Sequence, residues 1–216
     1  EQFIESLKDE SEGVIENVNI VNPNMLVDIN IKNLNGLIYN ISSIVGLNKG
    51  EINNCTVNGR INVNNKLYSY GTYGCNNSVY YNVGGIAGNN IGKITSCFSN
   101  IEIQYHSIAE IGQGENYGKS RSHVYSRIGL LSGINDKNGS ISKSYSDAQL
   151  TYTYQTINTT DGSSHNYVMM GGLVGYNLSG STINECYSNA DISGGTETLT
   201  YVGGLVGIND DNAEIN

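Results

Sequence analysis

Tyrosines are the residues of this sequence whose type and grouping best suit recognition chemistry. The chain holds 16 Tyr and no Trp, and many of the tyrosines stand beside Gly, Ser and Asn. This combination is typical of adaptable binding surfaces, because a rigid ring with one hydroxyl is flanked by small polar groups. We predict ligand-binding roles for Tyr68, Tyr70, Tyr73, Tyr80, Tyr81, Tyr117, Tyr125 and Tyr167. The alternative is that these rings pack their segments onto the rest of the molecule.

Cysteines, histidines and carboxylates lack the spacing of a metal site or a catalytic site. Cys55, Cys97 and Cys186 occupy equivalent sequence positions and Ser144 fills a fourth, which indicates a small core residue instead of a zinc ligand. No histidine belongs to an H-E-x-x-H motif, and the acidic residues are scattered, without the carboxylate pair of a glycosidase. We therefore expect no catalytic site, no metal and no cofactor, and we expect that the chain is not an enzyme.

Two further patterns could bind phosphate or calcium. Glycine-rich stretches such as 171–175 lack the helix pattern that follows a dinucleotide-binding loop, so we expect them to allow close backbone approach or a positive φ at a corner. The Asn and Asp clusters at 135–136 and 209–212 could offer several oxygens to calcium. We expect a solvated turn at both clusters, with calcium binding as the alternative.

Composition indicates β structure and excludes several kinds of partner. Gly is abundant, at 27 residues, Pro occurs once, and Ile, Val, Thr and Tyr are frequent, which is typical of strands joined by turns. The net charge of −9 argues against nucleic acid and against anionic lipid. No apolar run reaches the roughly 18 residues of a membrane helix. No signal peptide opens the sequence at Glu1, so we expect any export signal to have been removed or to lie outside it.

One sequence pattern recurs five times and sets the organisation of the chain. Each copy ends in a glycine, and an asparagine follows two residues later in every copy. The closing glycines are Gly46, Gly88, Gly133, Gly175 and Gly207, and the asparagines are Asn48, Asn90, Asn135, Asn177 and Asn209. Identical amides in stacked repeats can hydrogen-bond to one another, so we predict an internal asparagine ladder.

A second pattern, G-x-I-x-x-C, follows the first and leads into a strand. Beyond Cys97, small or apolar residues alternate through Ser99, Ile101 and Ile103, which predicts a strand with one buried face. The same alternation recurs beyond Ser144 and Cys186. On the opposite face, the equivalent residues Phe98, Tyr145 and Tyr187 are predicted to stack as an aromatic ladder.

The two patterns together read G-G-L-V-G-Y-N and then G-x-I-x-x-C-Y-S, most clearly in residues 171–188 and 203–209. This pattern resembles the GLUG motif, and the resemblance covers about residues 13–216. GLUG repeats are found in bacterial surface adhesins and beside the catalytic domains of IgA-cleaving metallopeptidases. The resemblance therefore implies a surface location and a β-solenoid fold, and it implies no single activity.

The predicted fold is an all-β, parallel β-solenoid of about five coils over residues 13–216, because stacked repeats bury a continuous core that no single repeat can bury. The column Ile44, Ile86, Leu131, Leu173 and Leu205 should lie inside. Loop insertions are expected at about 64–82, 106–127 and 153–167. Phe3, Ile4 and Leu7 have helical spacing, so residues 1–12 are predicted to form a short capping helix. Because residues 213–216 open a further repeat, we expect the native protein to continue beyond them, or this edge to pair with another copy.

The function predicted from these features is a repeat segment of a secreted or cell-surface bacterial adhesin or stalk. Its Tyr-rich insertions would contact a protein or glycan of a host or a neighbouring cell. A non-catalytic module of a large secreted metallopeptidase is the alternative, and a β-helical polysaccharide-degrading enzyme is a third, less favoured one. We expect self-association through the C-terminal coil, no nucleic acid partner and no insertion into a membrane.

Overall fold

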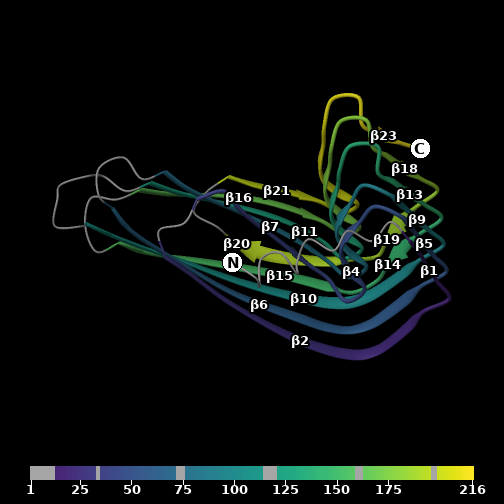
Figure 1. Cartoon of the computed structure of the whole chain (residues 1–216), viewed down its shortest axis with the longest axis horizontal. Helices are drawn as coiled ribbons and strands as arrows, with labels where there is room; N and C mark the ends of the chain where they lie inside the picture. Colours follow the sequence, from purple (N-terminus) through teal and green to yellow (C-terminus); the bar gives the residue numbers. More distant parts are fainter. Residues whose placement is uncertain (1–12, 33–34, 72–75, 114–120, 159–162, 196–198) are drawn as a thin grey trace.

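The computed structural model describes residues 13–32, 35–71, 76–113, 121–158, 163–195 and 199–216. These residues form a parallel β-solenoid whose strands belong to four sheets, numbered here 1 to 4 in the order in which the chain enters them (Figure 1). No helix occurs within the described ranges. The helical cap predicted for residues 1–12 lies outside the described residues.

Each of the sheets takes strands from successive coils. Sheet 1 contains β1 (Val14–Glu16), β5 (Glu51–Asn53), β9 (Lys93–Thr95), β13 (Ser140–Ser142), β18 (Thr182–Asn184) and β23 (Glu214–Ile215). Sheet 2 contains β2 (Asn19–Lys32), β6 (Thr56–Gly71), β10 (Phe98–Gln113), β14 (Tyr145–Ser146), β15 (Gln149–Asn158), β19 (Tyr187–Ser188) and β20 (Asp191–Gly195). Sheet 3 contains β3 (Leu37–Ile41), β7 (Asn76–Gly84), β11 (Arg121–Gly129), β16 (Ser163–Gly171) and β21 (Thr200–Gly203). Sheet 4 contains β4 (Val45–Asn48), β8 (Ala87–Asn90), β12 (Ser132–Asn135), β17 (Val174–Asn177) and β22 (Val206–Asn209).

Neighbouring coils are paired in parallel and in register with the sequence repeat. Strand β10 pairs with β6 without a break from Phe98 opposite Thr56 to Gln113 opposite Gly71. Sheets 3 and 4 each hold five strands, one from each coil. The predicted parallel β-solenoid of about five coils is confirmed, because residues one repeat apart in sequence are neighbours in the stack.

The insertions are not loops, and this part of the prediction was wrong. Strands β6 and β7 together cover most of residues 64–82, and β10 with β11 and β15 with β16 cover much of the other two insertions. The reason is that insertions of neighbouring coils pair with each other along their length, as β11 does with β7 and β16. Pairing satisfies the backbone N–H and C=O groups and lets alternate side chains be buried. The result is a pair of long sheets, 2 and 3, that extend away from the short-stranded sheets 1 and 4 (Figure 1).

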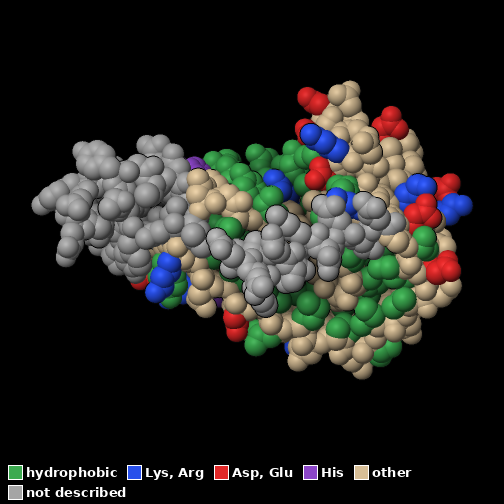
Figure 2. Space-filling view, in the orientation of Figure 1, with side chains coloured by type: hydrophobic (Ala, Val, Ile, Leu, Met, Phe, Trp, Pro, Cys, Tyr) green, Lys and Arg blue, Asp and Glu red, His purple; other side chains and the backbone are tan. Residues whose placement is uncertain are grey.

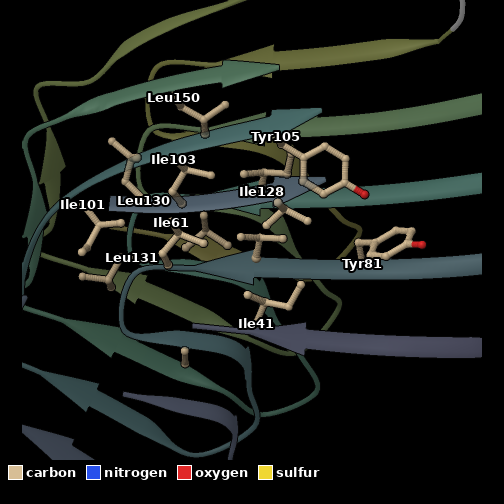
Figure 3. Packing of buried hydrophobic residues seen from close by; sticks show 14 of the residues in the cluster. Ile41, Ile61, Tyr81, Ile101, Ile103, Tyr105, Ile128, Leu130, Leu131 and Leu150 are labelled. Atoms are coloured by element: carbon tan, nitrogen blue, oxygen red, sulfur yellow. The ribbon is translucent and has the colours of Figure 1, made fainter. Parts of the chain in front are cut away.

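The core lies between these sheets. Figure 3 shows Ile61, Ile103 and Leu150 of sheet 2 facing Ile41 and Ile128 of sheet 3. The predicted interior column is also confirmed, with its end members Ile44 and Leu205 half-buried against the core. In three steps of the column a backbone N–H donates to the carbonyl of the next coil: Ile86 to Leu131 at 2.9 Å, Leu131 to Leu173 at 3.0 Å and Leu173 to Leu205 at 2.8 Å. The side chains of Ile86, Leu131 and Leu173 are fully buried. Burying an aliphatic side chain of this size contributes about 1.5–3 kcal/mol, so the columns of the stack dominate its stability.

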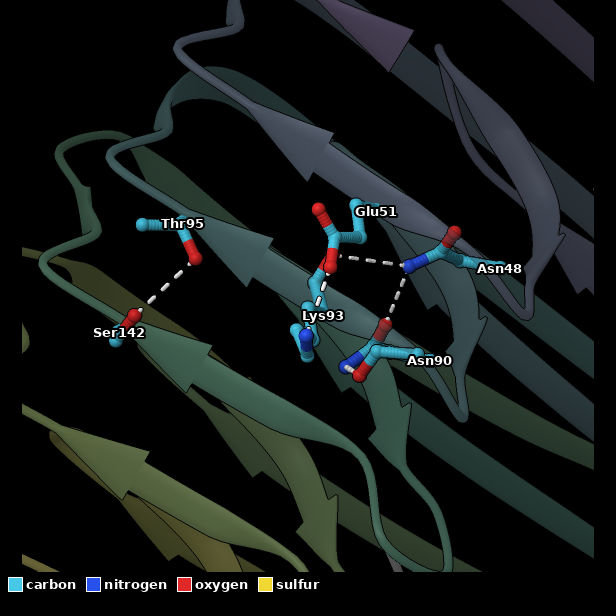
Figure 4. Close-up of polar contacts among 7 residues, drawn as sticks. Asn48, Glu51, Asn90, Lys93, Thr95 and Ser142 are labelled. Atoms are coloured by element: carbon cyan, nitrogen blue, oxygen red, sulfur yellow. Dashed lines mark hydrogen bonds and ion pairs between the residues drawn. The ribbon is translucent and has the colours of Figure 1, made fainter. Parts of the chain in front are cut away.

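The predicted asparagine ladder runs through all five coils. Each Nδ2 donates to the Oδ1 of the next coil: Asn48 to Asn90 at 2.7 Å, Asn90 to Asn135 at 2.8 Å, Asn135 to Asn177 at 2.9 Å and Asn177 to Asn209 at 2.8 Å. Figure 4 shows the first step, where Asn48 also donates to the backbone carbonyl of Lys93 at 3.3 Å. The ladder keeps most of its buried amide groups hydrogen-bonded, although Oδ1 of Asn48, at the first step, has no donor among the described residues.

The cysteine column and the aromatic ladder also have the predicted places. Cys55, Cys97 and Ser144 are fully buried at the corner between sheets 1 and 2, and Cys55, Cys97 and Cys186 are free thiols. Just outside this corner the ring of Tyr145 stacks on those of Phe98 and Tyr187, with centroids 4.3 and 4.9 Å apart. The equivalent positions of the repeat therefore form columns on both sides of the backbone.

A left-handed residue precedes the cysteine position in every coil. The φ angles are 59° at Asn17, 51° at Asn54, 55° at Ser96, 49° at Lys143 and 53° at Glu185. This single residue turns the chain from sheet 1 into sheet 2. The sequence did not reveal it, since only Asn among these residues is typical of that conformation.

The glycine pairs serve close approach between coils. A Cβ at Gly85 would lie 2.4 Å from the carbonyl oxygen of Leu130, and one at Gly84 would lie 2.7 Å from Cα of Ser132, both in the next coil. Neither glycine has a positive φ. Of the two explanations that the sequence allowed, close backbone approach is the one that applies to this pair.

Candidate binding surface

Three tyrosines form a stacked strip on the outer face of sheet 3. Tyr125 is aligned with Tyr80 in one neighbouring strand and with Tyr167 in the other. The residues next to them in sequence, such as Val79 and Val124, are fully buried, so alternation turns these three rings outward. Ring centroids are 4.7 Å apart for Tyr80 and Tyr125 and 4.8 Å apart for Tyr125 and Tyr167, with interplanar angles of 10° and 7°. This surface is called the tyrosine strip below.

Two histidines extend the tyrosine strip along the strands. His123 and His165 stack with centroids 5.3 Å apart, and the ring of His123 lies 6.2 Å from that of Tyr167. His165 is exposed and the three tyrosines are half-buried. The strip therefore offers ring edges, hydroxyls and imidazoles to a ligand in solution.

Arg127 borders the other end of the strip. Its guanidinium carbon lies 5.3 Å from the ring centroid of Tyr80 and 5.6 Å from that of Tyr176, which are cation–π distances. Nη1 donates to Oδ1 of Asn82 at 3.2 Å, and the buried Nε has no hydrogen-bond partner in the described part of the chain. Burial lowers the pKa of Arg127, but an arginine stays charged at neutral pH.

The hydroxyl of Tyr125, at the centre of the strip, remains protonated at neutral pH. Burial raises the pKa of Tyr125, and the neighbouring Tyr80 and Tyr167 add to the increase. A protonated phenol both donates and accepts a hydrogen bond. The strip can therefore bind groups with hydroxyls or amides, which includes both glycans and peptide backbones.

The structure distributes the predicted tyrosines over different surfaces. Tyr80, Tyr125 and Tyr167 come together in the strip. Tyr68 lies in β6 on the outer face of sheet 2, with the ammonium of Lys66 4.6 Å from its ring centroid. Tyr70 belongs to the same strand, but its side chain is outside the described part of the structure. Tyr73 and Tyr117 lie wholly outside the described residues.

Tyr81 is a core residue, and its predicted ligand contact was wrong. Its side chain is fully buried, because alternation turns it inward when Tyr80 points outward. Figure 3 shows its ring among the buried side chains, near that of Tyr105. Its hydroxyl donates to Oδ1 of Asn65, and Asn65 in turn donates to Ser107 at 3.1 Å. For this residue the alternative interpretation, packing, is correct.

Arg127, Tyr176 and the two stacked histidines were not predicted as part of the site. A usable signal was present for some of them, since His123, Tyr125 and Arg127 alternate in one strand and must share a face. Tyr176 comes from sheet 4, and only the folded structure brings it to Arg127.

The described residues contain no group of three or more His, Cys, Asp or Glu side chains placed to hold a metal ion. The Asn and Asp clusters take part in ordinary turns. At one of them, Oδ1 of Asp136 accepts a hydrogen bond from the backbone N–H of Lys137 at 2.7 Å. Within the same described ranges, no helix is long and apolar enough to cross a membrane.

Comparison with known proteins gives one match. Residues 166–193 match the family described as the GLUG motif, and this segment holds the last two strands of the fourth coil and the first strands of the fifth. No curated protein and no solved structure matches the chain. Residues 166–193 therefore carry a GLUG motif, and the other coils place strands in the same four sheets as this segment.

Proposed function

We propose that this GLUG-motif solenoid is a repeat segment of a secreted or cell-surface bacterial adhesin or stalk, and that the tyrosine strip is its binding surface. The observation that carries the proposal is the in-register alignment of Tyr80, Tyr125 and Tyr167 on one outer face. A solenoid places equivalent side chains at a regular spacing of roughly 4.8 Å, which suits an extended ligand on a host or neighbouring cell.

The composition of the molecular surface supports an interaction role. On the face shown in Figure 2, charged side chains gather mainly near the short strands of sheet 1, and much of the rest is hydrophobic or uncharged. Tyrosine and arginine are enriched at the energetic centres of protein interfaces, and both occur in the strip. The proposed ligand is a protein or a glycan. Nucleic acid would require a basic surface and a lipid bilayer would require a membrane segment, whereas a protein or a glycan requires neither.

We further propose that the chain has no catalytic activity. Carboxylates of sheet 2 are held in ion pairs on the outer surface: Glu102 with Arg60 at 2.6 Å and Glu110 with Lys66 at 3.2 Å. A catalytic carboxylate must lie within hydrogen-bond reach of the reacting group of a substrate. The carboxylates of Glu102 and Glu110 are instead directed at Arg60 and Lys66.

The proposed binding role can be tested with a variant that keeps the stack. Replacing Tyr80, Tyr125 and Tyr167 together by Phe preserves the rings and removes the hydroxyls. The wild-type chain should bind members of an array of cell-surface glycoproteins and glycans, and the triple variant should bind them roughly tenfold more weakly, since the loss of a few hydrogen bonds has this effect. Asn189→Ala, at an exposed position bonded to Asp147, is the control. Equal binding by the triple variant, or no binding by the wild type, would contradict the proposal.

A further inference from the structure

A second surface, on the outer face of sheet 2, contains a hollow lined mainly by polar side chains. The hollow is shallow and has a volume of about 490 Å³, which lies within the range of ligand-binding clefts, roughly 300–1,000 Å³. Its walls come from four successive coils, since residues of β2, β6, β10 and β15 line it. Nothing in the tyrosine strip contributes to it.

Two rows of polar side chains line the hollow. Gln104 is aligned with Asn62 on one side and Thr151 on the other, and His106 is aligned in the same way with Asn64 and Thr153. Parallel pairing sets the three members of a row roughly 4.8 Å apart along the stack. The hollow thus presents a small grid of amides, hydroxyls and an imidazole, all of which can exchange hydrogen bonds with a ligand.

The hydrogen bonds within the hollow leave part of this grid unused. Gln104 donates to Glu102 at 2.6 Å, and Nδ1 of His106 lies 2.5 Å from the hydroxyl of Thr153. Asn62 differs, because its buried Oδ1 has no donor in the described structure. A buried acceptor without a donor is unfavourable, so a ligand hydroxyl that donates to Oδ1 of Asn62, once this side chain has turned toward the hollow, removes that penalty.

The charges around the hollow select a neutral ligand. Among the described residues, no Lys, Arg, Asp or Glu lines the hollow, and the nearby Arg60 and Glu102 neutralise each other in an ion pair at 2.6 Å. The carboxylate of Asp28, which accepts a bond from Asn64 at 2.7 Å, disfavours an anion. A cation would require a carboxylate in the lining itself.

An apolar side chain completes the site. Leu26 lines the hollow, is aligned with Asn62 and is 65% exposed. A ligand with hydroxyl groups at its edges and an apolar C–H face fits a polar grid beside an exposed leucine. We propose that this hollow binds a neutral oligosaccharide, with Asn62 and Gln104 as its main hydrogen-bonding residues.

The proposal can be tested by affinity electrophoresis of the whole chain in gels that contain a neutral polysaccharide (a β-glucan, a mannan or a galactan) or polygalacturonate. At least one neutral polymer should retard the wild-type chain, and polygalacturonate should not. Asn62→Ala with Gln104→Ala should weaken the retardation roughly tenfold. The matched control Asn189→Ala and the Tyr→Phe variant of the strip should behave as the wild type, which separates this site from the proposed binding role of the strip.

Three results would overturn the proposal. One is a wild-type chain that no neutral polymer retards. Another is equal retardation by polygalacturonate. The third is a double variant that is retarded like the wild type while circular dichroism shows it folded. If the double variant does not fold, the amide resonances of Thr151 and Gln104 in the wild type decide the matter: they should shift when the retarding polymer's oligosaccharide is added, and unchanged resonances would refute the site.

Discussion

At the residue scale, the asparagine ladder is the clearest case of one side chain repeated for one purpose. Asn135 is fully buried and bonds to the ladder amides on both sides, at 2.8 and 2.9 Å. Asn135→Ala should lower the free energy of unfolding by about 2–3 kcal/mol, because it removes two buried side-chain hydrogen bonds and leaves a cavity in their place. Asn189→Ala, at an exposed position, should change it by less than about 0.5 kcal/mol. Urea denaturation of both variants measures the difference, and equal effects would show that the ladder does not stabilise the fold.

Buried tyrosines and thiols should make the fold sensitive to alkali. Burial is the largest cause that raises the pKa of Tyr81, Tyr105 and Tyr152 well above the usual value, and burial raises the pKa of Cys97 to about 11. The unfolded chain releases these protons first, from about pH 9 for Cys and about pH 10 for Tyr. Stability is therefore fully present below these values and is lost as the pH rises through them.

The alkaline prediction is checked by urea denaturation between neutral pH and pH 11, together with tyrosine absorbance. The free energy of unfolding should stay level up to about pH 8 and then fall. Tyr152→Phe should make the fall shallower, although Asn166, which donates to the Tyr152 hydroxyl at 2.6 Å, loses a partner. Tyrosines that all ionise near pH 10 in a chain that is still folded would contradict the burial described here.

At the scale of the element, the corner between sheets 1 and 2 depends on one left-handed residue in each coil. Lys143 has a φ of 49° and an exposed side chain. Lys143→Asn should raise the free energy of unfolding by about 0.5–1 kcal/mol, since Asn tolerates this conformation better. Lys137→Asn is the matched control, because Lys137 is also exposed and does not have a positive φ. Thermal unfolding compares them, and no gain at Lys143 would show that the corner carries no strain.

The elements also show what the sequence could and could not predict. Strands that start at the cysteine position were predictable, because Cys97, Ser99, Ile101 and Ile103 alternate and the pattern recurs. The long extensions of sheets 2 and 3 were taken for loops, since their polar and aromatic residues look irregular within a single copy. Only pairing with the neighbouring coil shows the strands, as between β11 and β7.

The candidate sites were predictable to different degrees for the same reason. Three tyrosines of the strip were predicted from composition alone, and Tyr81 was wrongly included because composition does not fix which way a ring points. Arg127 contacts Tyr80 of sheet 3 and Tyr176 of sheet 4, and the sequence does not show that these two sheets meet there. The hollow with Asn62 and Gln104 depends on register across coils, which a list of residue types does not contain.

At the scale of the whole molecule, the coil of residues 199–216 leaves interior positions uncovered. Val202 is aligned with the buried Met170, yet it is 55% exposed, and Leu199 is 56% exposed. An exposed strand edge can pair with a strand of another chain, and we propose that a second copy of the chain stacks on this coil. Light scattering over a concentration series should show the apparent mass rising, and Val202→Lys should suppress the rise while Asn189→Lys does not. A constant mass for the wild type would refute the proposal.

Both proposed sites and every ladder depend on parallel, in-register stacking of the coils, and nuclear Overhauser effects between backbone protons test this most directly. The structure predicts nuclear Overhauser effects between aligned residues of β10 and β15, such as Gln104 and Thr151, and between aligned residues of β10 and β6. The competing arrangement pairs consecutive long strands, β6 with β7, as antiparallel hairpins. Cross-peaks that link residues one repeat apart, in parallel order, would support the account. Cross-peaks that link β6 to β7 in antiparallel order would contradict it.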